Sequence, residues 1–202
     1  GIALVAGWTP PCEGQDRKAG TPDALRNSRP NVVVFLADDL GWGDLGCYGH
    51  PFLQTPHLDR FAQEGQRYTQ CYSGGSICSP SRAALLTGRV PFRVGIYHLA
   101  GGAQYLRREE ITIAELLKKV GYQTFFAGKW HLSNLVTQPT PGDQGFDHWL
   151  ASRGNAPKTT KNPTGFWRNG KALKNLVGYN CDAIVNEAIG WLGKRDPERP
   201  FF

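Results

Sequence analysis

The chain has 202 residues, of which 40% are hydrophobic and 11% aromatic, a composition typical of one globular domain with a sizeable core. Its net charge is +6, but Lys and Arg are scattered in nothing longer than short pairs, which argues against a nucleic-acid-binding protein. No apolar run is long enough to span a membrane, and the five cysteines form no Cys-x-x-Cys pair typical of zinc sites.

The first 29 residues differ in composition from the rest. Residues 1–8 (GIALVAGW) are typical of the end of a signal peptide, and a stretch rich in Pro, Gly and charged residues follows. An N-terminal extension without targeting value is the alternative. The chain contains no methionine, so we expect a fragment or a processed form. We therefore interpret residues 1–29 as a signal-peptide remnant and linker, and residues 30–202 as the folded domain.

A strand, a helix and a second strand are predicted next. Residues 32–37 (VVVFLA) form an apolar, β-branched run typical of a buried strand in a parallel sheet. Asp38 and Asp39 follow at its carboxyl end, the edge at which open α/β sheets bind ligands. Residues 55–64 are predicted to form a helix, and residues 66–72 the next strand. The two carboxylates either serve a ligand or are a solvated strand end.

Cys78 lies at the start of another predicted helix. Ser79 suits the N-cap, Pro80 the first helical position and Gly88 the end. Cys78 is therefore expected beside unpaired backbone N–H groups, where a thiolate or an oxyanion is stabilised. Arg82 lies one turn further along and should point back toward Cys78. The pattern predicts an anion site with a reactive group at its edge; a buried, inert thiol is the alternative.

The next predicted elements are a helix and a strand. A capping box begins the helix of residues 112–120, and residues 122–127 form the strand. This strand would carry Lys129 and His131 to the sheet edge at which the two carboxylates lie. Two residues apart on a strand end, these side chains are able to share one face. Taken alone, however, a Lys-x-His sequence indicates little.

The last third of the chain begins with residues 133–174, which are rich in Pro, Gly, Asn and Lys and are expected to form an irregular insertion of surface loops with short pieces of structure. Residues 182–192 have the pattern of an amphipathic helix, and residues 200–202 are expected to begin a strand. Strands and helices therefore alternate without internal repeats. This order predicts an α/β sandwich with a largely parallel central sheet flanked by helices.

Several segments resemble one known family. Residues 78–89 (CSPSRAALLTGR) match every fixed position of the pattern Cys-x-Pro-Ser-Arg-x-x-Leu-x-Thr-Gly-Arg, which marks type I, formylglycine-dependent sulfatases. Residues 31–44 (NVVVFLADDLGWGD), 55–65 (TPHLDRFAQEG), 121–132 (GYQTFFAGKWHL) and 145–147 (GFD) resemble further sulfatase blocks, in the order of the family. From residue 30 onward the chain thus resembles the N-terminal part of an arylsulfatase-like catalytic domain. The resemblance implies an alkaline-phosphatase-like fold that is incomplete at its C-terminus.

The resemblance also implies a nucleophile and a metal. In this family the signature cysteine is oxidised to formylglycine, and the hydrate of that aldehyde is the nucleophile; the matching residue is Cys78. The residues that match the ligands of one divalent cation, usually calcium, are Asp38, Asp39 and Cys78. Oxygen atoms are the ligands that a hard cation prefers. The modification itself is covalent chemistry that a sequence does not show.

Three further side chains receive roles from the resemblance. Arg82 matches the arginine that holds the hydrate and a neighbouring carboxylate, for which a rigid fork of donors is suited. Lys129 matches the lysine that binds sulfate oxygens, and His131 the histidine that contacts the formylglycine hydroxyl. A positive clamp and an imidazole suit the charge that develops during sulfuryl transfer. Ser133 departs from the glycine that commonly follows this block.

The implied activity is the hydrolysis of sulfate esters, either carbohydrate or aryl sulfates, by an exported protein of the periplasm, the lysosome or the extracellular space. A formylglycine-generating enzyme would be its partner during maturation. The family's remaining metal ligands, a second lysine and a histidine acid are expected beyond residue 202, so we expect the 202-residue chain alone to be inactive. The alternatives are a phosphate or phosphonate ester hydrolase of the same superfamily and a non-catalytic, truncated sulfatase-like protein.

Overall fold

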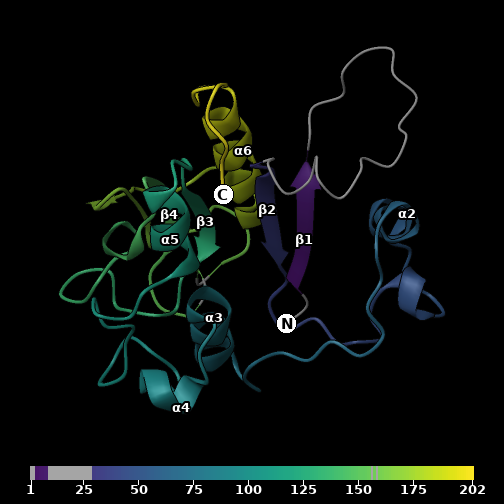
Figure 1. Ribbon diagram of the computed structural model, residues 1–202, viewed down its shortest axis with the longest axis horizontal. Coiled ribbons are helices and arrows are strands. Elements are labelled where there is room, and N and C mark those ends of the chain that lie inside the picture. The colour runs from purple at the N-terminus through teal and green to yellow at the C-terminus, as the bar shows by residue number, and fades with distance from the viewer. Residues whose placement is uncertain (1–2, 9–28, 156, 158) are drawn as a thin grey trace.

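The computed structural model describes residues 3–8, 29–155, 157 and 159–202. Strands and helices come in groups along the chain: two strands are followed by a run of helices, and further strands then lead into a C-terminal helix (Figure 1). In order, the elements are β1 (Ala3–Trp8), β2 (Asn31–Leu36), η1 (Gly46–Tyr48), α2 (Pro56–Glu64), α3 (Cys78–Thr87), α4 (Pro91–Val94), α5 (Ile113–Lys119), β3 (Phe125–Lys129), η2 (Gly142–Gln144), β4 (His148–Ser152), β5 (Phe166–Arg168), β6 (Lys171–Ala172) and α6 (Asn180–Leu192).

The strands form two sheets, one mixed and one antiparallel. One sheet has the order β3-β4-β5-β6, in which β4 pairs parallel with β3 and the later strands pair antiparallel. The other consists of β2 and its antiparallel partner β1. The α/β prediction is confirmed, and the sheet is mixed.

The C-terminal residues lie between these two groups. Phe201 pairs parallel with Gln123, and the Phe125 N–H donates to the Phe202 carbonyl at 2.7 Å. On the other side, the Val32 N–H donates to the Phe201 carbonyl at 2.8 Å. Residues 200–202 are therefore bonded to strands on both sides, as a strand would be, but the structure has an isolated bridge at Phe201 and not a full strand.

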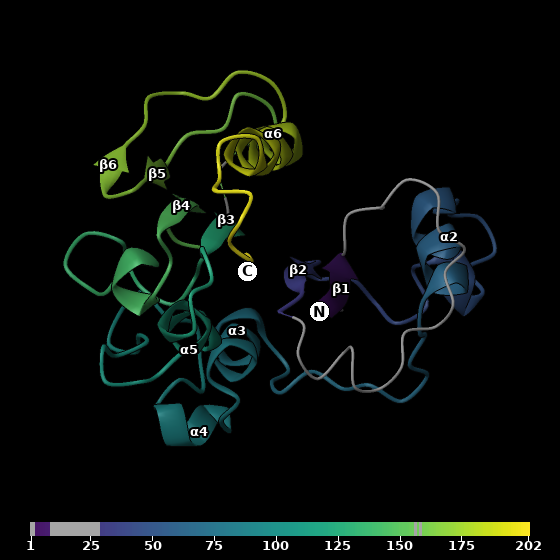
Figure 2. The same cartoon turned by 45° about the horizontal axis from the view of Figure 1, so that its top comes forward.

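Helices cover both faces of β3 and β4, with α6 on one side and α3 and α5 on the other (Figure 2). Neighbouring residues of β3 point to opposite faces, as strand geometry requires. Phe125 stacks on Trp191 of α6, with ring centroids 4.9 Å apart, whereas Phe126 packs against Trp130 and Phe146 on the other face. The main core lies on that second face.

Three predictions about strands need correction. Residues 66–72 form no strand: Tyr68 and Tyr72 are exposed there. The expected insertion of residues 133–174 contains β4, most of which is buried. β2 was expected to be buried within a parallel sheet, but it pairs antiparallel with β1 and its Phe35 is 62% exposed. In each case a short apolar or aromatic run does not reveal its partners, which are distant in sequence.

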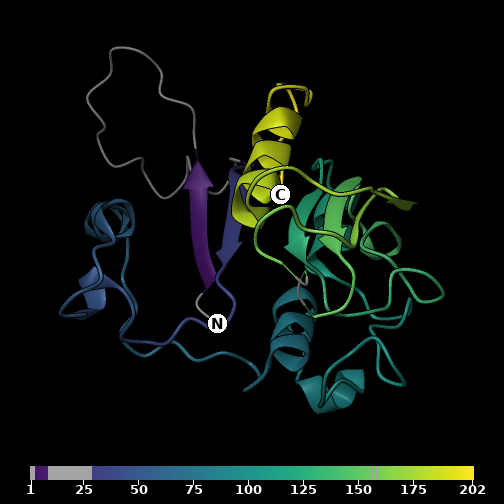
Figure 3. The same ribbon diagram turned by 180° about the vertical axis from the view of Figure 1, so that it is seen from behind.

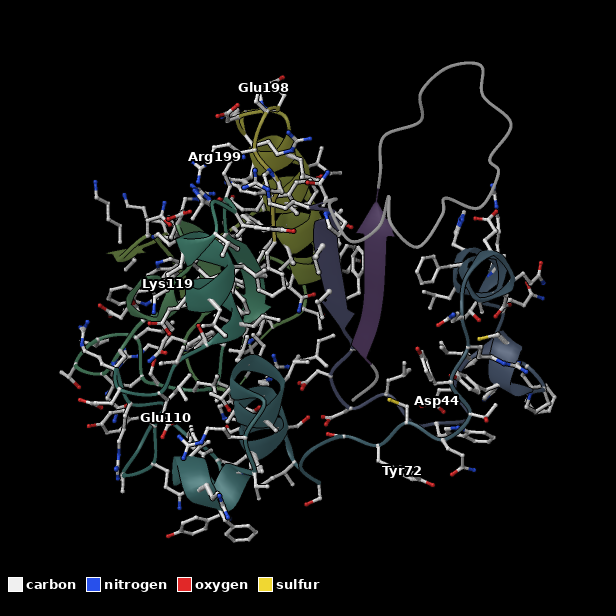
Figure 4. The ribbon with its side chains drawn as sticks, in the orientation of Figure 1. Asp44, Tyr72, Glu110, Lys119, Glu198 and Arg199 are labelled. Carbon is white, nitrogen blue, oxygen red and sulfur yellow. The ribbon has the colours of Figure 1, made fainter. Side chains whose placement is uncertain are left out.

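The segment that contains η1 and α2 stands apart from the core. Seen from opposite sides, α2 lies across β1 from α3 and β3 (Figure 1, Figure 3). Figure 4 shows Asp44 and Tyr72 on this same side of the molecule. The helix itself was predicted correctly, and it begins at Pro56, but none of its residues is buried.

The prediction for residues 1–29 concerns a region of which only part is described. Residues 3–8 form β1, and residues 1–2 and 9–28 lie outside the described residues. Within the described part of the chain, no helix combines the length and the apolar character that a membrane crossing requires.

Candidate active site

Two cationic side chains and one carboxylate meet where β2 and β3 end. The Lys129 ammonium donates to Oδ2 of Asp38 at 2.6 Å, and the Arg82 guanidinium donates to Oδ1 at 3.0 Å. Both cationic side chains are nearly buried, with 11% and 9% of their surfaces exposed. The sequence placed Asp38 and Lys129 at one edge of the sheet, and the structure brings them together there.

The cations determine the charge of the carboxyl group. Burial raises the pKa of Asp38, but hydrogen bonds from Lys129 and Arg82, together with their positive charges, outweigh burial and hold the pKa below its ordinary value. Asp38 is therefore ionised at neutral pH. The two cations thus hold a single anionic group between them.

Arg82 also connects α3 to β3. Its guanidinium donates a second hydrogen bond, from Nη1 to the Lys129 carbonyl, at 2.6 Å. A planar fork of donors serves a carboxylate and a carbonyl at once, which a lysine does not do with fixed geometry. The Arg82 Nε is buried without a hydrogen-bond partner among the described residues. The side chain is therefore held by the sheet edge and keeps one donor unused.

Cys78 is the first residue of α3, and the helix begins two residues earlier than predicted. The N-cap residue is Ile77, and the helix ends at Gly88, whose φ of 65° and bond to the Ala84 carbonyl confirm the predicted end. The prediction that Ser79 caps the helix is wrong. Its hydroxyl instead reaches two backbone groups outside the helix, because a fully buried hydroxyl must find partners where it lies.

Four of the predicted site residues line one pocket. Asp38, Asp39, Cys78 and Arg82 share it with residues 75–77 and Ser81. Cys78 is half-buried at its helix start, so the sulfur lies near the positive end of the helix. Asp39 adopts a φ of 57°, in the left-handed region that Asp tolerates better than most residues. This turn lets two adjacent carboxylates line the same pocket.

His131 lies just beyond the end of β3 and is 3% exposed. Burial, followed by the positive charge of Lys129, lowers its pKa to about 4. Arg82 acts in the same direction and Asp38 opposes it. The imidazole is therefore uncharged at neutral pH, and its Nδ1 is buried without a partner among the described residues. Its φ of 53° shows that the strand alternation predicted for Lys129 and His131 ends before the histidine.

The described residues do not complete a cation site. Nowhere in the described ranges do three or more His, Cys, Asp or Glu residues gather closely enough to hold a metal ion. Both oxygens of Asp38 already accept hydrogen bonds from cations. A calcium ion wants six or more oxygen ligands. Asp38, Asp39 and residue 78 are thus at most part of such a site.

Comparison with known proteins agrees with this arrangement. The family model called Sulfatase matches residues 30–202. The chain belongs to the sulfatase family. It is 36% identical over 180 residues to the N-acetylglucosamine-6-O-sulfatase of Bacteroides thetaiotaomicron, a match that covers 89% of this chain and 30% of that protein. It is 55% identical over 125 residues to arylsulfatase A of Homo sapiens, a match that covers 60% of this chain and 25% of that protein.

Solved structures share the fold. Ps i-CgsB superposes with a TM-score of 0.77 at 29% identity, over 83% of this chain and 42% of that one. BT4656, solved in complex with its substrate D-glucosamine-2-N,6-O-disulfate, superposes with a TM-score of 0.67 at 35% identity, over 81% of this chain and 31% of that one. The resemblance and the fold expected from it are confirmed. This sulfatase chain spans between a quarter and a third of the length of the curated relatives described above.

One residue of the site was missed from the sequence. Ser79 stands at the unspecified position of the signature pattern, and its hydroxyl joins the start of α3 to His131. The only sequence signal was a hydroxyl residue directly after Cys78, which was assigned to helix capping.

Proposed function

We propose that the whole protein hydrolyses sulfate esters in the pocket that Asp38, Cys78 and Arg82 line. The observation that carries the proposal is the pair of nearly buried cations, Lys129 and Arg82, which hold one anion beside Cys78 at a helix start. Fixed positive groups with little water around them suit the negative charge that a sulfuryl group develops during transfer.

Cys78 is the nucleophile position in this proposal, after its conversion to formylglycine by a maturation enzyme. By resemblance to the family, one hydroxyl of the aldehyde hydrate attacks sulfur and the alcohol of the ester leaves. Loss of the proton of the second hydroxyl then expels sulfate and restores the aldehyde, which water hydrates again. Lys129 is positioned to bind sulfate oxygens, since its ammonium already lies on an anion. Arg82 orients the carboxylate of Asp38. His131, uncharged above a pH of about 4, is able to accept or donate a proton at its ring nitrogens.

We further propose calcium as the metal of the whole protein, with Asp38, Asp39 and residue 78 as partial ligands. The chemistry of the donors supports this, because carboxylate oxygens suit a hard cation. When bound, the ion would polarise the sulfate oxygens. Each oxygen of Asp38 accepts one hydrogen bond and keeps a second lone pair, so the ion would bind beside Lys129 and Arg82 and against the repulsion of their positive charges.

The substrate class that we propose is a carbohydrate sulfate. The names of the relatives support it: one is an N-acetylglucosamine-6-O-sulfatase, and one solved neighbour holds a sulfated glucosamine. Export of the protein, to the periplasm, the lysosome or the extracellular space, fits such substrates and is proposed with it. A phosphate or phosphonate ester hydrolase remains the second candidate, because the same cations would bind a phosphoryl group equally well.

Side-by-side kinetics test the proposal. The whole protein is expressed together with a formylglycine-generating system, and sulfate and phosphate esters of the same alcohol are compared. We expect higher kcat/KM for the sulfate ester and an aldehyde mass on the peptide that contains residue 78. Higher efficiency on the phosphate ester, or full activity with an unmodified thiol, would overturn the proposal.

A further inference from the structure

The hydroxyl of Ser79 joins the start of α3 to the loop that follows β3. Its side chain is completely buried. The hydroxyl donates to the His131 carbonyl at 2.6 Å and accepts from the Ala100 N–H at 2.9 Å. One oxygen atom therefore satisfies two backbone groups on two segments that are distant in sequence.

These bonds link the two halves of the site. Ser79 directly follows Cys78, and His131 lies two residues after Lys129. The bond from Ser79 thus sets the distance between the nucleophile position and the histidine. Arg82 makes the neighbouring connection, to the Lys129 carbonyl, so the two segments are bonded at two points.

His131 needs such a restraint. Its φ of 53° lies in the left-handed region, which His adopts more often than most residues but which is still uncommon for any residue except glycine, so bonds to the surrounding backbone help to hold it there. The Ser79 hydroxyl bonds the carbonyl of this residue itself. The next carbonyl, that of Leu132, accepts from the Leu106 N–H at 2.8 Å. The imidazole is therefore oriented by a backbone that Ser79 helps to fix.

We propose that Ser79 is a positioning residue for sulfate ester hydrolysis, acting through His131. The catalytic part of this inference rests on the function proposed above, whereas the anchoring of the loop does not. Removing the hydroxyl leaves the Ala100 N–H and the His131 carbonyl buried and unpaired, so the loop of residues 130–133 loosens while Lys129 and Arg82 keep their bonds. Substrate affinity should then change little, and turnover should fall.

Thr124 provides a matched control. It is completely buried like Ser79, and its hydroxyl also donates to a carbonyl, that of Gly145 at 2.6 Å, and accepts from a backbone N–H, that of Asp147 at 2.9 Å. It bonds none of the site residues. Thr124→Val therefore removes a hydrogen-bonded hydroxyl of the same kind without touching the site.

The experiment compares Ser79→Ala, Ser79→Thr and Thr124→Val in the whole protein. Formylglycine content at residue 78 is measured by mass spectrometry, and rates are divided by it, because Ser79 adjoins the modified residue. We expect Ser79→Ala to lower kcat by about 10- to 100-fold with KM within about threefold of the parent protein, as a small misplacement of a reacting group does. Ser79→Thr, which keeps the hydroxyl, should recover most of the rate, and Thr124→Val should leave kcat unchanged.

Hydrogen exchange provides a readout that is independent of activity. In Ser79→Ala, residues 98–101 and 130–133 should exchange faster than in the parent protein, and in Thr124→Val they should not. Unchanged exchange in Ser79→Ala would overturn the proposal whether or not the protein hydrolyses sulfate esters. Faster exchange with an unchanged kcat, or equal loss of kcat in Ser79→Ala and Thr124→Val, would overturn the positioning role. A parent protein that carries formylglycine but is inactive on sulfate esters would refute the proposed function instead.

Discussion

Two helices of this chain, α3 and α2, have equally clear sequence signals but differ in how much of their surface is buried. The helix α3 contributes buried residues to a core that also includes Trp130 and Phe146. The helix α2, predicted just as well, buries none of its residues, and Phe52 before it is 85% exposed. Capping and Pro positions therefore specify where a helix lies, whereas burial depends on partners that the local sequence does not name.

The difference matters for the site because its fixed cations belong to the buried region. Lys129 and Arg82 are held by β3 and α3, and they reach Asp38 at the point where the chain leaves for η1 and α2. The carboxylates therefore lie at the junction of the two regions. We expect substitutions in the buried region to affect chemistry and stability, and substitutions near α2 to affect neither.

The largest effect should come from the nucleophile position. Cys78→Ala in the whole protein should lower kcat for a sulfate ester by about 10³-fold or more, because no other group replaces a covalent nucleophile. Cys71→Ala is the control, since Cys71 is an exposed thiol on the side of α2. Near-normal turnover of Cys78→Ala, with circular dichroism showing an intact fold, would refute the proposed mechanism.

The second largest effect concerns stability. Trp130 is 1% exposed and packs against Phe126 and Phe146 at centroid distances of 5.2 and 6.1 Å. Trp130→Ala should lower the free energy of unfolding by about 3–5 kcal/mol through lost burial and a cavity. Phe52→Ala should change it by less than about 0.5 kcal/mol. Urea denaturation measures the free energy of unfolding of both variants. Similar losses in Trp130→Ala and Phe52→Ala would show that the two regions do not differ in packing.

A third prediction concerns pH. Because the pKa of His131 in the folded protein is lowered from 6.5 to about 4, an unfolded chain takes up the proton first as the pH falls. The stability contributed by the neutral, buried imidazole is therefore complete above pH 6.5 and is lost between pH 6.5 and 4, by roughly 3 kcal/mol.

Two variants test this prediction by urea denaturation at several pH values. His131→Asn should remove the loss between pH 6.5 and 4, and Asn tolerates the left-handed backbone at this position. His57→Asn, an exposed residue of α2, should not change the profile. Equal profiles for the parent protein and His131→Asn would mean that the imidazole is not buried as the structure shows.

The accuracy of the sequence-based predictions also differed between features that have local signals and features that depend on distant partners. Helices with local signals, such as α5 with its capping box at Thr112 and Glu115, were predicted closely. β4 was missed because a five-residue strand with only three apolar residues, in a region rich in Pro and Gly, has no local signal that separates it from a loop. The convergence of Asp38 and Lys129 was predicted from a shared sheet edge, and their side chains do meet, although β2 and β3 belong to different sheets.

The contacts of Ser79 were not predictable in this way. A serine before a proline has the local pattern of a helix cap, and only the packing of two distant segments against it assigns its hydroxyl to His131 and Ala100. Likewise, a pair of aspartates after a strand indicates ligands for a cation, but not that Lys129 and Arg82 occupy both oxygens of the first one. Long-range partners, and not residue types, decide such roles.

The smallest expected effect is the binding of calcium to the 202-residue chain. The positive charges of Lys129 and Arg82 beside Asp38 repel a cation, and Asp39 and residue 78 supply too few further oxygens, so calorimetry should give a Kd weaker than about 10⁻⁴ M. Asp39→Asn should weaken it further. Lys129→Met should strengthen it, because it removes one of the two positive charges beside Asp38. Tight binding that neither Asp38→Asn nor Asp39→Asn reduces would show that the carboxylates at the junction of the two regions are not ligands.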